Sequence, residues 1–88
     1  MVEILDEMNN LYSLIYSYRS DIASYKKNKI EKRADAWKDA TGTAKEKEDY
    51  VRSVVANIDE AIDFCEAEIE KAYNSIRVLE LKLEYTNE

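Results

Sequence analysis

The sequence predicts an all-α protein, an antiparallel two-helix hairpin (helix-turn-helix) in a single domain spanning residues 1–88. Three observations indicate this fold. The chain has no Pro and one Gly, whereas sheets and loop-rich folds need many turn residues. Apolar residues recur at alternating spacings of four and three in two long runs, which is the pattern of a coiled-coil seam. The single Gly lies between the two runs, where a hairpin must reverse.

The first run predicts a helix over about residues 3–40. Its seam then shifts by about one position to Ile30, Ala34 and Trp37, because a straight helix drifts against a strict seven-residue repeat. Trp37 has two interpretations: it caps the open end of the core, or it is an exposed anchor for a partner. The seam before the shift consists of Ile4, Met8, Leu11, Ile15, Tyr18, Ile22 and Tyr25.

The stretch "KDATGTAKE" predicts the turn, at about residues 41–43. Gly42 suits the left-handed conformation that ends a helix. Thr43 and Glu46 have the spacing of a capping box, in which each side chain satisfies a free backbone N–H at a helix start. So short a connection forces the two helices to be antiparallel neighbours.

The second run predicts a helix over about residues 43–86. Cys65 occupies a seam position, so we expect it to be a small buried residue rather than a reactive thiol. The alternation of spacings is unbroken through Val51, Val55, Ile58, Ile62, Cys65, Ile69, Ala72, Ile76, Leu79 and Leu83.

Both helices carry further apolar residues beside the seam, and a two-helix core leaves these uncovered. We therefore expect two hairpins to pair into a four-helix bundle, as a homodimer or a heterodimer. The alternative is that the Tyr rings only line the rim with their hydroxyls in water. These rows hold Leu5, Tyr12, Leu14 and Tyr16, then Tyr50, Val54, Ala61, Phe64, Val78, Leu81 and Tyr85. The candidate partner-binding residues are Trp37, Tyr50, Val54, Ala61 and Phe64.

The composition argues against catalysis and cofactors. The chain has no His, one Cys and one Gly, so it lacks the commonest general base and cannot form a glycine-rich phosphate loop. We predict a non-enzyme without a cofactor. A net charge of −6, from 13 basic and 19 acidic residues, disfavours nucleic acid as a partner.

Two charged stretches have simple structural explanations. An acidic row at helical spacing (Asp59, Asp63, Glu66, Glu70) is expected to be a solvated face, with a metal site as the alternative. A basic cluster (Lys26–Arg33) is expected to pair with Glu46, Glu48 and Asp49 across the hairpin. No apolar run is long enough for a membrane span. The opening "MVEILDEMNN" lacks the basic region of a signal peptide.

The layout of about 90 residues, a helical hairpin and a Trp and Gly near the turn ("WKDATG") resembles the WXG100 or ESAT-6-like family. The resemblance extends to small helical partners of LXG toxins. It implies a dimeric protein exported by type VII secretion, or a targeting partner that binds the helical N-terminal domain of a toxin. The Trp-to-Gly spacing is longer than the family's Trp-x-Gly. The family's C-terminal Tyr-x-x-x-acid signal has no clean counterpart in "YTNE" or "YNSIR", which fits export with a signal-bearing partner.

Two other functions share this fold. One is an adaptor or inhibitor inside the cell, for instance phage-encoded, that binds one protein target. The other is a structural coiled-coil assembly unit. Without a signal peptide, we expect a cytoplasmic protein, which under the secretion interpretation would leave the cell by a signal-independent route.

Overall fold

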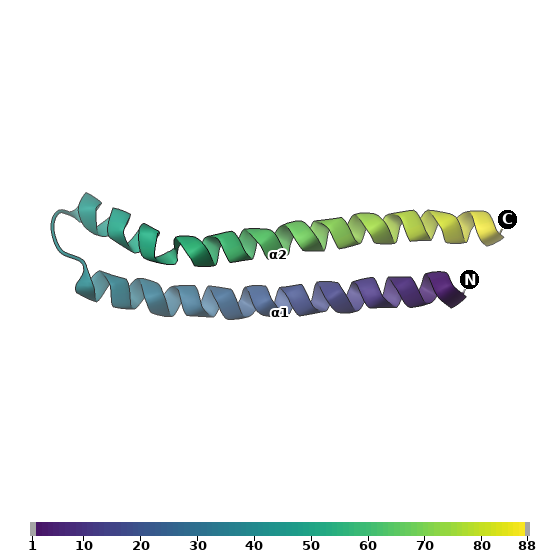
Figure 1. The fold of residues 1–88 in the computed structure, drawn as a ribbon, viewed down its shortest axis with the longest axis horizontal. Helices are drawn as coiled ribbons and strands as arrows, with labels where there is room; N and C mark the ends of the chain where they lie inside the picture. The colour runs from purple at the N-terminus through teal and green to yellow at the C-terminus, as the bar shows by residue number, and fades with distance from the viewer. Residues whose placement is uncertain (1, 88) are drawn as a thin grey trace.

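The computed structural model describes residues 2–87, which form two antiparallel α-helices joined by a short turn (Figure 1). Helix α1 spans Val2–Asp39 and helix α2 spans Ala44–Asn87. The two ends of the chain lie together at one end of the rod, and the turn lies at the other (Figure 1). The rod measures 67 × 18 × 12 Å. The predicted all-α hairpin is confirmed.

The turn is closed by backbone hydrogen bonds on both sides of Gly42. The Ala40 N–H donates to the Ala36 carbonyl at 2.8 Å, which completes the last turn of α1. Gly42 has φ +102°, in the left-handed region that side chains with a Cβ rarely adopt. The Thr43 hydroxyl accepts from the Glu46 N–H at 3.2 Å, so Thr43 acts as the N-cap of α2. Within residues 2–87, the Thr43 N–H donates no hydrogen bond to the Glu46 side chain. The cap therefore has one of the two hydrogen bonds of a capping box.

The core is one layer of side chains between the helices, and α2 supplies most of it. In α1 only Ile15 and Ala36 are fully buried, and the half-buried seam residues are Ile4, Met8, Leu11, Tyr18, Ile22, Tyr25 and Lys29. A two-helix hairpin can cover only a narrow stripe on each helix, so the core is long and thin. The buried residues of α2 are Val51, Val55, Ile58, Ile62, Cys65, Ala72, Ile76 and Leu79.

The predicted shift of the α1 seam is wrong. Ile30 is 69% exposed and Ala34 is exposed, and the seam instead continues through Lys29 to Ala36 in the strict seven-residue repeat. Lys29 fits this position because its aliphatic stem covers the seam while its ammonium group reaches Asp59 on α2, at 2.6 Å. The supercoiled pair therefore keeps the repeat in register where a straight helix would have drifted.

Candidate functional site

The hairpin has two broad faces, and a residue's position relative to the seam decides which face it joins. Successive residues of a helix are rotated by about 100°. In an antiparallel pair, residues that follow a seam residue share one face, and residues that precede one share the other. We call the first the Trp37 face (Tyr12, Tyr16, Arg33, Trp37, Arg52, Asp59). The second is the Phe64 face (Leu14, Tyr50, Val54, Ala61, Phe64, Glu68).

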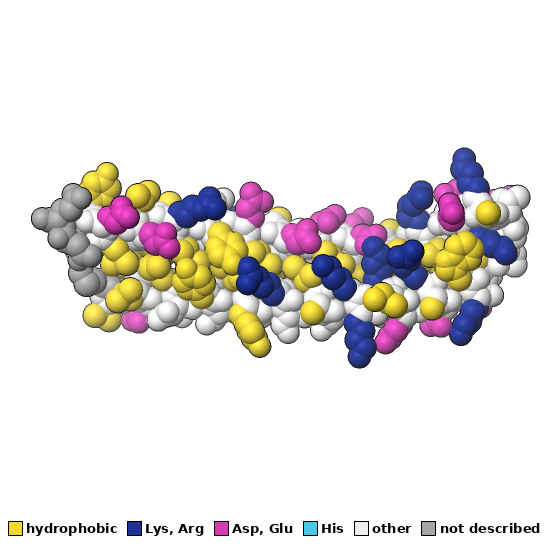
Figure 2. All heavy atoms as spheres, turned by 180° about the vertical axis from the view of Figure 1, so that it is seen from behind, with side chains coloured by type: hydrophobic (Ala, Val, Ile, Leu, Met, Phe, Trp, Pro, Cys, Tyr) yellow, Lys and Arg dark blue, Asp and Glu magenta, His cyan; other side chains and the backbone are white. Residues whose placement is uncertain are grey.

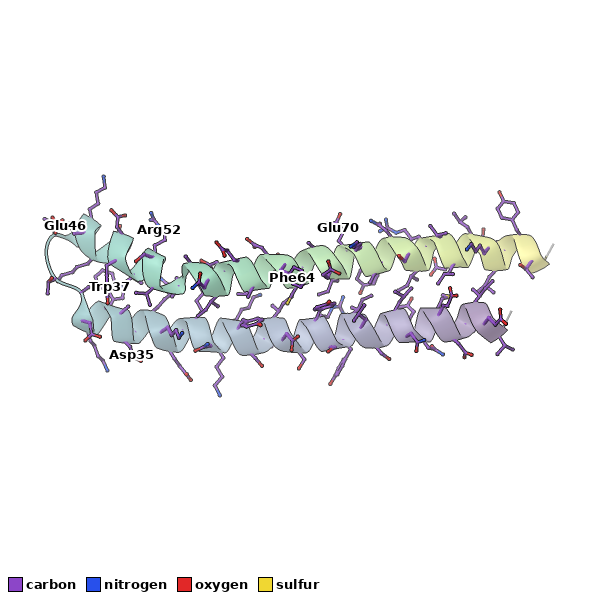
Figure 3. All side chains as sticks on the ribbon, viewed as in Figure 1. Asp35, Trp37, Glu46, Arg52, Phe64 and Glu70 are labelled. Carbon is purple, nitrogen blue, oxygen red and sulfur yellow. The ribbon has the colours of Figure 1, made fainter. Side chains whose placement is uncertain are left out.

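The structure does not bring the five candidate partner-binding residues together. Four of them directly precede the buried residues Val51, Val55, Ile62 and Cys65, so Tyr50, Val54, Ala61 and Phe64 lie on the Phe64 face. Trp37 follows the buried Ala36 and lies on the opposite face. Figure 3 shows Trp37 near the turn and Phe64 close to the middle of α2.

Each of these side chains is accessible to a partner. Trp37 is 44% exposed and Phe64 is 59% exposed. Tyr50 and Val54 are also exposed, whereas Ala61 is half-buried. Trp37 therefore neither closes the core completely nor stands free of it.

On the Phe64 face, aromatic contact and a shallow groove lie near the middle of the rod. The Phe64 ring meets the Tyr18 ring edge-on, with centroids 6.3 Å apart and an interplanar angle of 77°, a favourable aromatic geometry. Further toward the chain ends is a groove of about 160 Å³. It is lined by Leu11, Leu14, Glu68, Lys71, Ala72 and Ser75.

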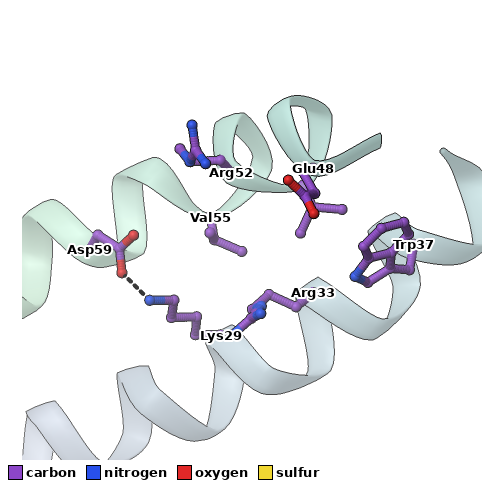
Figure 4. A pocket seen from close by; sticks show the side chains of 8 residues that line it. Lys29, Arg33, Trp37, Glu48, Arg52, Val55 and Asp59 are labelled. Atoms are coloured by element: carbon purple, nitrogen blue, oxygen red, sulfur yellow. Dashed lines mark ion pairs between the residues drawn. The ribbon is translucent and has the colours of Figure 1, made fainter. Parts of the chain in front are cut away.

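On the Trp37 face, a larger groove of about 460 Å³ opens near the turn (Figure 4). Val51 and Val55 contribute its apolar part and Trp37 lines the end nearest the turn. The Lys29–Asp59 ion pair crosses between the helices at the other end (Figure 4). Arg33, Glu48 and Arg52 complete the lining.

Charges of opposite sign run along the Trp37 face, where basic side chains from α1 stand beside acidic ones from α2 (Figure 2). Lys29 pairs with Asp59, and Arg19 donates a hydrogen bond to the Tyr73 hydroxyl. The Arg19 guanidinium also lies 5.7 Å from the Tyr73 ring centroid, which is within cation–π range. The basic cluster of α1 therefore meets α2 further from the turn than the predicted Glu46, Glu48 and Asp49. Of these, Asp49 pairs within its own helix, with Arg52 at 3.6 Å.

The acidic row offers no metal site in the part of the chain that the structure describes. No cluster of three or more His, Cys, Asp or Glu with a suitable arrangement occurs between residues 2 and 87. Asp59, the first residue of the row, is the partner of Lys29. The same described range contains no helix with the length and apolarity to cross a membrane.

Cys65 has the environment of a structural residue. It is a free thiol, 4% exposed, on the seam of α2. Burial raises the pKa of the thiol above its ordinary value, and the nearby Asp21 carboxylate raises it further. Since the thiolate is the reactive form, both effects make Cys65 a poor nucleophile at neutral pH.

Sequence reasoning missed the groove near the turn and the part that Lys29 and Asp59 play in it. The signal was present, because Lys29 lies four residues after Tyr25, the spacing that the seam requires. It was overlooked because the neighbouring Ile30 is apolar and Lys29 is charged.

Comparison with known proteins yields no relative: no protein-family model, no curated protein and no solved structure matches the chain.

Proposed function

We propose that this protein is a non-enzymatic interaction module whose Phe64 face binds the apolar face of another helical protein. One observation carries the proposal: α2 presents a second row of residues at spacings of four and three that the hairpin leaves exposed. Its large apolar members are Tyr50, Val54, Phe64, Val78 and Tyr85, exposed by between 37% and 76%.

The regular spacing of this row supports a helical partner over other ligands. Apolar residues that follow the seven-residue repeat fit the ridges of another helix. Scattered exposed apolar residues would carry no such meaning, because soluble proteins commonly have them. Aromatic residues among them supply large contact area and are typical of interface hot spots.

The resemblance to WXG100-like proteins gives this proposal its most specific version: the partner is a second secreted hairpin or the helical N-terminal domain of an LXG toxin. The alternative remains an adaptor or inhibitor that binds one protein target inside the cell. Acidic mimicry of nucleic acid is the weaker form of that alternative. Its acidic row lies beside the basic side chains of α1, so the two fields largely cancel (Figure 2).

The first test replaces Phe64 by Asp. We expect Phe64→Asp to weaken association at least about tenfold, because it places a charge at the centre of a desolvated surface. Helicity should stay close to that of the parent, since Phe64 is 59% exposed and lies outside the seam. The measurement is mass by light scattering, for the chain alone and co-expressed with its genomic neighbours, beside a circular dichroism spectrum.

The matched control is Tyr16→Asp, an exposed aromatic residue on the Trp37 face. If both variants weaken association equally, the binding surface does not lie on the Phe64 face. A stable complex with a neighbouring helical toxin domain would favour the secretion version, and indifference to every neighbour would favour the adaptor.

A further inference from the structure

We infer that the helical partner of the Phe64 face is a second copy of this chain, docked with α2 antiparallel to α2 about a two-fold axis between residues 69 and 70. The inference rests on the proposed function and names the occupant of that face. It concerns contact between the two α2 helices, with the α1 helices on the outside.

Apolar residues stand toward both ends of the second row on α2, and polar residues stand near its middle. The row keeps the alternating spacing of three and four residues from Tyr50 to Tyr85. An antiparallel pairing about a central axis sets the apolar residues of one end against those of the other end, because each layer pairs one position of the repeat with another from the opposite chain. The row consists of Tyr50, Val54, Asn57, Ala61, Phe64, Glu68, Lys71, Ser75, Val78, Lys82 and Tyr85.

The charges of the Phe64 face are complementary about this axis. With the axis between residues 69 and 70, Glu68 of each copy lies opposite Lys71 of the other, so the central layers hold two opposite-charge pairs. In the single chain these two side chains are 3.8 Å apart and only Glu68 is half-buried. A two-fold interface is self-complementary, so one acid and one base on the same stripe are enough to produce both pairs.

Neighbouring registers are worse. Sliding the axis by half a repeat toward the turn places Glu68 opposite Phe64 and Lys71 opposite Ala61, so charges face apolar side chains. A slide of one full repeat sets Val78 against Lys47 and leaves Tyr85 without a partner in α2. The proposed register sets Val54 against Tyr85 and Ala61 against Val78, and it pairs every member of the row except Tyr50.

The exposed Phe64 ring of one copy fits the shallow groove of the other. In the same register Phe64 of one copy lies opposite Ser75 of the other. Ser75 is a small residue that lines the shallow groove on the Phe64 face, together with Ala72, Leu11 and Leu14. The exposed Phe64 ring would therefore enter the groove of the second copy, as a knob enters a hole.

The polar composition of α1 on this face explains why α1 stays outside. Apart from Leu14, the positions of α1 that precede its seam are polar: Glu3, Glu7, Asn10, Ser17, Asp21, Ser24, Asn28, Glu31 and Asp35. Five of these are acidic, so bringing two α1 helices together across the axis would oppose like charges. The apolar row of α1 lies on the other face, so Leu11 and Leu14 in the groove are the apolar residues of α1 that the second copy contacts, and its other apolar contacts are with α2.

The experiment exchanges the central charges between chains. Glu68→Lys alone places Lys opposite Lys, and Lys71→Glu alone places Glu opposite Glu. We expect each single variant to raise the dimer dissociation constant by about tenfold, because like charges then oppose each other twice in one interface. Mixed in equal amounts, the two variants should form a heterodimer as tight as the parent dimer. The double variant Glu68→Lys/Lys71→Glu should self-associate like the parent. Native mass spectrometry and sedimentation equilibrium of mass-labelled chains measure all four.

Changes within one helix do not mimic this result. Each single variant carries a like-charge pair within its own α2, so an intrahelical effect would weaken the mixture as much as the separate variants.

A mixture without preference for the heterodimer overturns the register. A parent chain that stays monomeric at high micromolar concentration overturns the self-association. In that case binding of a helical partner that Phe64→Asp abolishes would still uphold the proposed function. A Phe64→Asp variant that alters no association of any kind would overturn both.

Discussion

At the scale of single residues, the reversal of the chain depends on Gly42 and Thr43 in different ways. Gly42 supplies the left-handed backbone, and Thr43 supplies the first cap of α2. The Glu46 carboxylate lies over Gly42, where a Cβ would overlap its oxygen. Glu46 can swing away because it is exposed, so the backbone conformation is the stronger constraint on residue 42.

We predict that Gly42→Val lowers the free energy of unfolding by about 1–3 kcal/mol, the usual cost of holding a residue with a branched side chain in this conformation. Chemical denaturation followed by circular dichroism measures the loss. Thr41→Val is the control, because it introduces the same side chain at the preceding, exposed position, where φ is negative. Equal midpoints for the two variants would show that residue 42 does not need its positive φ.

Single positions also mark the limit of sequence reasoning. Gly42 and Thr43 were predictable because their chemistry matches one local geometry. The side on which Trp37 lies was not, because a change of one residue in the assumed seam rotates every later side chain by about 100°. Placing Trp37 on the seam therefore grouped it with residues that lie on the opposite face.

At the scale of the helices, α1 and α2 differ in how strongly their sequences define the seam. In α2 every seam position is apolar, so its register followed directly from the spacing. In α1 the seam passes through Lys29 while Ile30 beside it is exposed. Judged by polarity alone, Ile30 would be assigned to the seam. Lys29 occupies the seam position instead, because its ammonium group pairs with Asp59 on α2.

Two Ile residues of α1 test this register directly. We predict that Ile15→Ala lowers the free energy of unfolding by about 2–4 kcal/mol, because Ile15 is 2% exposed and its loss leaves a cavity. Ile30→Ala, the same change at a side chain that is 69% exposed, should alter it by less than about 0.5 kcal/mol. Urea denaturation of both variants decides the matter. A larger loss for Ile30→Ala would restore the shifted seam that the structure excludes.

At the scale of the whole molecule, the hairpin has a thin core and two apolar rows that point in opposite directions. Chains this short bury little surface on folding, so an added partner contributes a large share of the total stability. The exposure of apolar residues outside the core was predictable from their surplus over what a two-helix core can bury. The separation of the rows onto two faces was not, because it depends on the relative register of both helices.

The proposed dimer has a definite length, which scattering can measure. The axis lies closer to the chain ends than to the turn, so the two copies are offset along the rod. From a rise of 1.5 Å per residue, we predict an overall length of about 80 Å, against 67 Å for one hairpin. Small-angle X-ray scattering across a dilution series should show this modest growth. A length near twice that of one hairpin would instead indicate end-to-end contact, which the α2 pairing excludes.

The position of Trp37 has an optical consequence. Because the chain contains one Trp, its tryptophan fluorescence comes from a single indole in the groove near the turn. The proposed pairing of the Phe64 faces leaves that groove uncovered, so we expect the Trp37 emission spectrum to stay constant as dimers form. A ligand that enters the groove, or fraying of the turn, changes the polarity around the indole and shifts the spectrum. One unmodified chain thus carries a built-in reporter that separates events on its two faces.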